Sequence, residues 1–326
     1  MTPPRVSTVI TAHDRREYLG EAVRSAIDAG ADEIVVVRNF SEPIDAPEGS
    51  YLDVLCTASE TGVKQATGVA RASGEVVAFL DDDDLWEPDK VRWLRDRFSA
   101  EPSLVYLNHT QRPIDASGAL VGSRHPEWAR RTPSKLDLWD RRDPGALFDE
   151  IWPGNSSSTV VRRSWAIDRL DDLREVGWSA DTFWLVAALL GGGTWAIVDR
   201  PLTRLRLHGQ NMSQGRDASA EEFRRRHARM CGRFGRSYAA MAGIATRGAG
   251  PDTPLARYLA QKSAGFRFLS DLEEGTGGRR AAMRALVDGR GWGDRAVLGT
   301  ALVAIASPSG ARRLLYWSGR RRWRIA

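Results

Sequence analysis

The sequence predicts an α/β protein with a largely parallel sheet flanked by helices, followed by a basic, mainly helical C-terminal region. Short apolar runs rich in Val, Ile and Leu alternate with helically spaced segments over the first third of the chain. Strand–helix alternation of this kind is typical of parallel sheets. From about residue 214 onward the pattern is helical and rich in arginine. We therefore expect two regions, 1–213 and 214–326.

The early elements follow in a regular order, each marked by its apolar pattern. A helix over residues 16–30 places Leu19, Ala22, Val23, Ala26 and Ile27 at helical spacing and stops at Gly30. Further strands and helices are expected at 6–11 (strand), 32–40 (strand), 51–57 (strand), 64–74 (helix), 75–80 (strand) and 87–100 (helix).

The middle of the chain is less regular but still favours strands. Residues 103–114 and 158–164 read as strands, and 118–122 is expected to pair with the first of them. A helix is expected over 179–192, with Ser179 as its N-cap, and a strand over 194–208.

Composition indicates an ordinary water-soluble protein of a reducing compartment. Hydrophobic residues make up 42% of the chain and charged residues 27%. Two distant cysteines, Cys56 and Cys231, support neither a disulfide framework nor a cysteine metal site. The N-terminus has no signal-peptide pattern, and the apolar run 296–306 is shorter than the about 20 residues that span a bilayer. These features predict a cytoplasmic protein.

The charge is divided unevenly along the chain. Residues 1–205 hold 24 Lys and Arg against 33 Asp and Glu, and residues 206–326 hold 23 against 9. An acidic N-terminal part and a basic C-terminal part predict different partners for the two regions.

The run of four aspartates from Asp81 to Asp84 directly follows the apolar strand 75–80. Adjacent carboxylates repel one another, and a hard divalent cation such as Mg²⁺ or Mn²⁺ offsets that repulsion. In an extended segment Asp81 and Asp83 would share one face and Asp82 and Asp84 the other. The alternative is a solvated acidic turn, in which Asp84 caps the next helix. In parallel sheets ligands bind beyond the carboxyl ends of the strands, so Ala12, His13 and Asp14 are expected at the same edge.

The sequence resembles a family-2 glycosyltransferase of the GT-A fold, a Rossmann-like α/β fold, over roughly residues 5–213. The segments that carry the resemblance stand in the order typical of the family. They are VSTVITAHDRREYLGEAVRSAI, DEIVVV, GVARASGEVVAFLDDDDLWEPDK, SADTFW and RLHGQNMS.

The resemblance implies a nucleotide-diphospho-sugar donor, inversion at the anomeric carbon and a divalent cation. It places metal and diphosphate binding on Asp81 and Asp83, and a ribose contact on Asp82. It implies nucleobase contacts from the first loop, which here reads Thr11, Ala12, His13 and Asp14.

The second loop departs from the family pattern, since Arg38 and Asn39 stand where an acidic pair is usual. Asn39 could bond a base edge and Arg38 could stack or reach phosphate, or the two are a surface arginine beside a turn asparagine. Lys64 either approaches a phosphate or is solvated.

The resemblance also implies an acidic pair at the catalytic base, and here that pair reads Ala180–Asp181. Asp181 is therefore the expected base, with Asp171, Asp172 and Glu175 as substitutes; the alternative is an aspartate that only favours the helix dipole. The resemblance implies a metal or diphosphate contact for His208, and Arg206 nearby could neutralise phosphate charge. Asn155, Ser156 and Trp178 are candidates for the acceptor pocket.

The basic region 214–326 mixes arginine with aromatic residues, which favours contact with an anionic membrane surface. A helical appendage with solvated arginines is the alternative, and nucleic-acid binding is not expected. The resemblance implies sugar or lipid-linked acceptors, in polysaccharide, glycan or glycolipid assembly for the cell envelope. Two other functions remain open: a non-catalytic binder of sugar nucleotides and a different metal enzyme built on an aspartate cluster.

Overall fold

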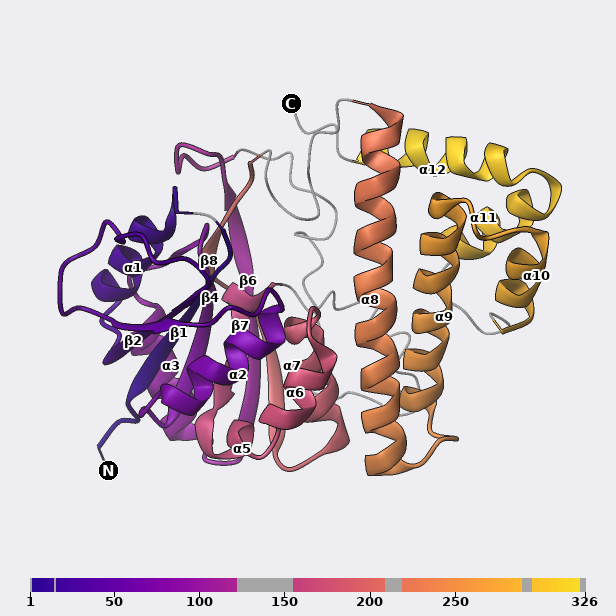
Figure 1. The fold of residues 1–326 in the computed structure, drawn as a ribbon. Coiled ribbons are helices and arrows are strands. Elements are labelled where there is room, and N and C mark those ends of the chain that lie inside the picture. Colours follow the sequence, from indigo (N-terminus) through magenta and orange to yellow (C-terminus); the bar gives the residue numbers. More distant parts are fainter. Residues whose placement is uncertain (1, 15, 122–154, 209–218, 289–294, 323–326) are drawn as a thin grey trace. The chain divides into compact units, whose positions relative to one another are not determined.

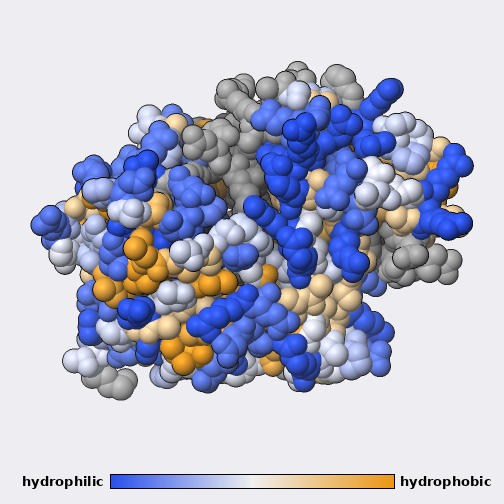
Figure 2. All heavy atoms as spheres, viewed as in Figure 1, coloured by the Kyte–Doolittle hydropathy of each residue, from blue (hydrophilic) through white to orange (hydrophobic). Residues whose placement is uncertain are grey.

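The computed structural model describes residues 2–14, 16–121, 155–208, 219–288 and 295–322 (Figure 1). The described residues divide into two compact units, with the boundary between Leu207 and His208. Hydrophilic side chains predominate on the face drawn in Figure 2. We describe the two units separately.

Unit 1, up to Leu207, is an α/β unit. Its elements are β1 (Val6–Ala12), α1 (Leu19–Asp28), β2 (Glu33–Arg38), β3 (Leu52–Leu55), α2 (Thr61–Arg71), β4 (Val76–Asp81), β5 (Leu85–Trp86), α3 (Lys90–Ala100), β6 (Leu104–Ile114), a 3₁₀ turn (Ser156–Ser158), β7 (Thr159–Arg162), α5 (Arg163–Ile167), α6 (Leu170–Val176), α7 (Ala180–Leu190) and β8 (Thr194–Arg206).

The strands form one mixed sheet in the order β3-β2-β1-β4-β7-β6-β8-β5. The pairs β3–β2, β2–β1, β1–β4 and β6–β8 are parallel, whereas β7 is antiparallel to β4 and β6, and β5 is antiparallel to β8. The prediction of a largely parallel sheet is confirmed for its first four strands. Ile114 forms an isolated antiparallel bridge with Leu120, as expected for residues 118–122.

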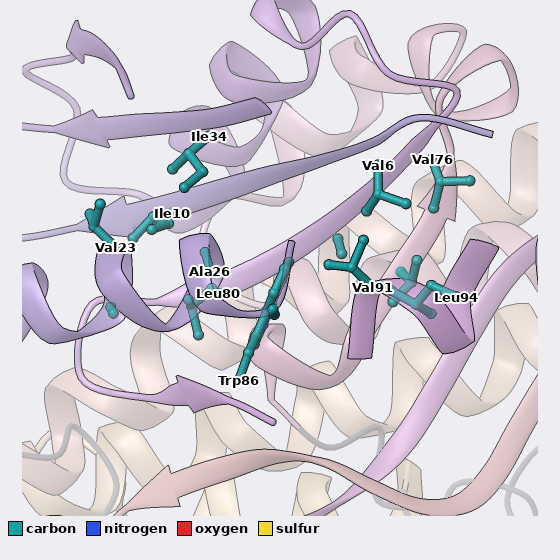
Figure 3. Close-up of a cluster of buried hydrophobic side chains, with 14 of the residues drawn as sticks. Val6, Ile10, Val23, Ala26, Ile34, Val76, Leu80, Trp86, Val91 and Leu94 are labelled. Carbon is teal, nitrogen blue, oxygen red and sulfur yellow. The ribbon is translucent and has the colours of Figure 1, made fainter. Parts of the chain in front are cut away.

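One face of the sheet is covered by α1 and α3. Alternate residues of the strands point to this face because the side-chain period of a strand is two. Figure 3 shows Val6, Ile10, Val76 and Leu80 from the strands with Val23 and Ala26 of α1 and Val91 and Leu94 of α3. Trp86 of β5 also lies in this cluster.

The opposite face is covered by α2 and α7. Gly68 of α2 approaches β1 so closely that a Cβ atom there would lie 2.3 Å from Val9 Cγ1. Trp184 of α7 stacks on Phe79 of β4, with ring centroids 5.7 Å apart. Since both faces are covered, β1 is buried along its whole length.

Two short helices are absent from the sequence prediction. The helices α5 and α6 have only 5 and 7 residues, too few for a periodic apolar pattern to stand out. The helix α2 begins at Thr61, three residues before its predicted start, and ends at Arg71 rather than at Gly74.

Unit 2, from His208, is helical among the residues that the structure describes. Its helices are α8 (Ala220–Ala249), α9 (Pro254–Glu274), α10 (Arg279–Asp288), α11 (Arg295–Ala306) and α12 (Pro308–Arg322). Ser219 and Thr253 cap α8 and α9 by accepting from the backbone N–H groups of Glu222 and Ala256. The helical C-terminal region is as predicted.

An apolar cluster joins the helices of unit 2. Cys231 of α8 lies with Phe268, Leu269 and Leu272 of α9 and with small apolar residues of α10, α11 and α12. In the described part of the chain, no helix combines the length and the apolar character needed to cross a membrane.

Candidate active site

Three parallel strands end at the same edge of the sheet. Thr11 of β1 pairs with Asp81 of β4, and Ala12 pairs with Arg38 of β2. The first loop, the second loop and the aspartate run therefore meet at this edge, as the sequence predicted for a parallel sheet. The backbone N–H of His13 donates to Asp82 Oδ2 at 3.3 Å.

The aspartate run is a turn rather than an extended segment. Asp81 is the last residue of β4, and the N–H of Asp84 donates back to the carbonyl of Asp81 at 3.3 Å. The predicted alternation of faces is therefore wrong beyond Asp81, because the backbone leaves the extended conformation. Asp82, Asp83 and Asp84 are buried, with exposed fractions of 4%, 7% and 1%.

Asp84 anchors the turn and does not cap a helix. Its Oδ2 accepts from Asn155 Nδ2 at 2.7 Å and from Ser157 Oγ at 2.6 Å, and its Oδ1 accepts from the Arg206 N–H at 2.8 Å. The N-cap position of α3 belongs to Asp89 instead, so the capping alternative was wrong. Burial, together with the charge of Asp83, raises the pKa of Asp84 to about 7, although these hydrogen bonds lower it.

Asp81 is the half-buried member of the run and lies near several other carboxylates. Burial first, and then the carboxylates of Asp84, Asp83, Asp82 and Asp181, raise its pKa well above the ordinary value. The contribution of Asp181 means that the predicted base and the aspartate run lie within electrostatic reach of each other in unit 1.

The first and second loops are held together by side-chain hydrogen bonds. Asn39 Nδ2 donates to Asp14 Oδ1 at 2.8 Å, and the Asp14 N–H donates to Asn39 Oδ1 at 3.0 Å. Asn39 Nδ2 also lies 3.0 Å from His13 Nδ1. Asp14 has a φ of +54°, a conformation in which asparagine and aspartate are favoured over most other non-glycine residues. This arrangement fixes both loops at the strand edge.

Lys64 lies beneath the first loop rather than in solvent. Its Nζ donates to the Ala12 carbonyl at 2.6 Å and lies 3.2 Å from His13 Nδ1. Its exposed fraction is 1%, so the solvated alternative was wrong. Burial lowers the pKa of Lys64, and the charge of Asp82 opposes that shift. Its predicted role in phosphate binding stays a prediction.

Arg38 uses its donors within the protein. Its Nε donates to Asp53 Oδ1 at 2.8 Å, its Nη2 to the other oxygen of Asp53, and its Nη1 to the Glu42 carbonyl. Arg38 is 6% exposed, so it is not a surface residue. These bonds join β2 to β3 and favour a structural role over a nucleotide contact.

Asp181 lies in the first turn of α7, and Ser179 occupies the N-cap position without a side-chain capping bond. Asp181 Oδ1 accepts from the Thr182 N–H at 2.8 Å. Burial raises the pKa of Asp181 to about 6, against the hydrogen bonds from Thr182. A carboxyl group with a pKa near neutrality suits a general base. Asp171, one of the substitutes, pairs with Arg174 at 2.6 Å on an exposed surface.

Of the three predicted acceptor residues, Asn155 contacts the aspartate turn, whereas Ser156 and Trp178 contact other residues of unit 1. Asn155 bonds Asp84, as above, and Ser156 Oγ accepts from Gln65 Nε2 at 3.0 Å. The Trp178 ring meets the His13 ring edge-on, with centroids 6.5 Å apart. Asn155 and Ser156 therefore support neighbouring residues, and acceptor contacts by these three residues remain a prediction.

Arg206 and His208 fall on either side of the unit boundary. Arg206 is fully buried in unit 1, where its Nε donates to the Asp83 carbonyl and its Nη2 to Glu21, at 2.8 and 2.7 Å. It therefore fastens the aspartate turn. His208 is assigned to unit 2, so its predicted metal contact is not placed against the aspartates.

Residues 7–166 match the family model described as glycosyl transferase family 2. This segment belongs to glycosyl transferase family 2. The match confirms the predicted family over this segment, and the mixed sheet with its flanking helices confirms the predicted α/β fold class.

A curated relative is the uncharacterized glycosyltransferase alr2836 of Nostoc sp. strain PCC 7120, 28% identical over 116 residues. The alignment covers 32% of this chain and 36% of the relative, so the chain matches about a third of that protein's length.

Two crystal structures of residues 1–349 of TarS from S. aureus are also similar. One covers 97% of this chain and 91% of that chain, at 13% identity and a TM-score of 0.47. The other, in complex with UDP-GlcNAc, covers 99% and 93%, at 13% identity and a TM-score of 0.49. These values do not define a substrate for this chain.

The family-2 domain offers oxygen donors that fit a hard divalent cation. Asp81 and Asp83 are the candidate ligands. Burial first, and then repulsion from the neighbouring carboxylates, raises the pKa of Asp81, and a cation would offset that repulsion. Among the residues that the structure describes, no three His, Cys, Asp or Glu side chains are arranged to hold a metal ion. A divalent cation at this site stays a prediction.

Three supporting residues of this domain were missed from the sequence. Gln65 accepts from Trp184 Nε1 at 2.9 Å, which ties α7 to α2. The buried Lys90 Nζ donates to the Ser157 carbonyl at 2.8 Å, and Ser157 in turn bonds Asp84 and the Asp81 N–H. The sequence signal for Lys90 was its place as the first residue of α3, shortly after the aspartate turn.

Proposed function

We propose that unit 1 transfers a sugar from a nucleotide-diphosphate donor to an acceptor hydroxyl, with inversion and with the help of a divalent cation. The family match supports a sugar transferase, and we infer a hexosyltransferase. The observation that carries the proposal is the meeting of the first loop, the second loop and the aspartate run at one edge of the sheet. The charge of Asp181 is also among the causes that raise the pKa of Asp81, which supports Asp181 as the base of the same site.

In the proposed reaction Asp181 takes the proton of the acceptor hydroxyl. The acceptor oxygen then forms a bond to the anomeric carbon from the face opposite the leaving diphosphate, and the bond between that carbon and the phosphate oxygen breaks. A divalent cation held by Asp81 and Asp83 would stabilise the charge that grows on the diphosphate. Asp84, Asn155 and Ser157 hold the aspartate turn in place during this step.

A thermal-shift panel tests the donor class. UDP, GDP, dTDP and CDP sugars are each added to the full chain with and without Mn²⁺. Selective binding to the folded protein raises its melting temperature by linkage, so one donor is expected to raise it in a metal-dependent way. No shift with any donor would contradict nucleotide-sugar binding.

The variant Asp181→Asn separates catalysis from binding. It should lose transfer by at least about 100-fold, the lower range for a general base, while its donor-dependent thermal shift is kept. Asp171→Asn is the matched control, because Asp171 is exposed on α6. Full transfer by the Asp181→Asn variant would show that another residue is the general base. Donor binding without transfer by the parent chain would favour a non-catalytic binder.

We also propose that the acceptor is a lipid-linked or envelope glycan and that unit 2 contacts an anionic membrane surface, on its cytoplasmic face. Four exposed arginines of α8 support this: Arg225, Arg229, Arg236 and Arg247. At 3.6 residues per turn they fall within about 40° of arc on the helix. Figure 2 shows hydrophilic side chains over part of α8. A basic helical stripe of this kind attracts anionic lipid.

A further inference from the structure

Unit 2 contains a chain of three reactive side chains that the proposed function does not use. His227 and Cys231 lie one turn apart on α8, and Glu273 lies on α9. Cys231 Sγ lies 3.5 Å from His227 Nε2, and His227 Nδ1 lies 2.9 Å from Glu273 Oε1. The imidazole therefore stands between a thiol and a carboxylate, the arrangement in which a base activates a nucleophile and a third group orients the base.

Burial decides how the charge is distributed among these three side chains. The Glu273 side chain is fully buried, and in the described part of the chain its Oε2 has no hydrogen-bond partner. A buried carboxylate is costly unless a positive group faces it. Transfer of the Cys231 proton to His227 Nε2 places an imidazolium next to Glu273 without changing the net charge. The carboxylate thus favours a thiolate–imidazolium pair over a thiol and a neutral imidazole.

The surroundings of the imidazole support its charged form. Burial alone would lower the pKa of His227, but the hydrogen bonds and charges of Cys231 and Glu273 outweigh it and raise the pKa to about 9. Phe223 stacks on the ring, with centroids 5.3 Å apart and an interplanar angle of 19°. Tyr316 of α12 and the Arg226 guanidinium approach Phe223, at 5.5 and 5.8 Å.

Cys231 belongs to an apolar cluster of unit 2. The cluster also holds Phe268, Leu269 and Leu272 of α9, Ala282 of α10, Val297, Ala301 and Ala304 of α11, and Ala311 of α12. Cys231 is 1% exposed, whereas the His227 side chain is 17% exposed. The imidazole is therefore the most exposed of the three side chains, and only a small reagent is expected to react with the buried sulfur.

We propose that Cys231 is an activated thiolate, paired with His227 and Glu273, and a site of oxidation by small hydroperoxides. The sulfur attacks one peroxide oxygen, so an S–O bond forms as the O–O bond breaks. Sulfur is oxidised by two electrons and the peroxide is reduced. Attack on the terminal oxygen releases an alkoxide, or hydroxide from hydrogen peroxide itself. This anion takes the proton from His227 Nε2, which yields an alcohol or water, neutral imidazole and cysteine sulfenic acid. This proposal is independent of the proposed glycosyl transfer.

The test uses the full chain with Cys56→Ser, which leaves Cys231 as its single thiol. Hydrogen peroxide is added, and the gain of one oxygen atom on Cys231 is followed by mass spectrometry. We expect Cys231 to gain this oxygen faster than Cys56 does in a chain with Cys231→Ser. A rate equal to or below that of Cys56 would overturn the proposal.

Two variants in this background separate activation from simple burial. His227→Gln keeps a hydrogen-bonding side chain but carries no charge, and should slow sulfenic acid formation by about tenfold or more. Glu273→Gln should slow it by a smaller factor. A chain with Cys231→Ser and Cys56 retained gives the rate of an ordinary, partly exposed thiol. An unchanged rate in a folded His227→Gln chain, checked by circular dichroism, would also overturn the proposal.

Discussion

Asp181 carries a charge that depends on pH near neutrality. Burial raises its pKa to about 6, so the carboxylate form required of a base is lost as the pH falls through that value. We expect transfer, measured as kcat/KM at saturating Mn²⁺, to fall about tenfold per pH unit below 6 and to level off above 7. Asp171→Asn should follow the same curve as the parent chain. A profile that is flat between pH 5 and 8 would contradict the assignment.

Asp84 links the aspartate turn to pH-dependent stability. Its folded-state pKa of about 7 is raised above the ordinary carboxyl value, so its contribution to stability is present at low pH and is lost as the pH rises toward 7. In the presence of EDTA, the parent chain should lose about 2–3 kcal/mol more than Asp84→Asn between pH 5 and 8. Urea unfolding at the two pH values measures this, and equal losses would exclude Asp84 as the source.

At the scale of elements, the packing of α2 on β1 depends on one glycine. An alanine at Gly68 would place its Cβ 2.3 Å from Val9 Cγ1 and 3.2 Å from Val37 Cγ2, in a fully buried layer. Overpacking of a core costs about 1–3 kcal/mol, and the higher helix propensity of alanine returns about 1 kcal/mol. We therefore expect Gly68→Ala to lower the free energy of unfolding by up to about 2 kcal/mol, measured with urea.

The matched control for this glycine is Gly243 in α8. There the nearest atom to an added Cβ is Arg247 Nη1 at 3.6 Å, an ordinary contact at the end of a flexible side chain. Gly243→Ala should therefore stabilise its helix by up to about 1 kcal/mol. If Gly68→Ala also stabilises, β1 and α2 adjust to the added methyl group more easily than the close approach implies.

Elements that carry a strong local pattern could be predicted from the sequence, and elements fixed by distant contacts could not. The strand β1 and the helix α1 show apolar residues at periods that follow directly from burial on both faces of a strand and on one face of a helix. The helices α5 and α6 are too short to show a period. The antiparallel place of β7 between β4 and β6 depends on pairing across more than 40 residues of sequence.

The candidate site follows the same division. The concentration of carboxylates at Asp81–Asp84 and the position of Asp181 at a helix start are visible in the sequence. The roles of Asp84, Arg38 and Lys64 are not visible in the sequence, because each depends on partners elsewhere in the chain. These partners are Asn155 and Arg206 for Asp84, Asp53 for Arg38, and the Ala12 carbonyl for Lys64. Sequence therefore located the charged groups but not the partners that hold them.

At the scale of the whole molecule, the uneven charge predicts where membrane contact would arise. Each arginine near an anionic surface contributes about 1 kcal/mol, so replacing Arg225, Arg229 and Arg236 with glutamine should weaken binding by about 3 kcal/mol, or roughly 100-fold. The matched variant replaces the same three residues with lysine, which keeps the charge. Both are compared with the parent chain by flotation with phosphatidylglycerol vesicles and with neutral phosphatidylcholine vesicles.

The expected result is flotation of the parent and lysine chains with anionic vesicles only, and its loss in the glutamine chain. Added salt should weaken the binding, because it screens charges separated by more than a Debye length. Flotation of all three chains alike would show that the exposed arginine stripe of α8 is a solvated surface. Binding to neutral vesicles as well would instead indicate an apolar contact, for which the exposed Leu302 and Leu314 of α11 and α12 are the candidates.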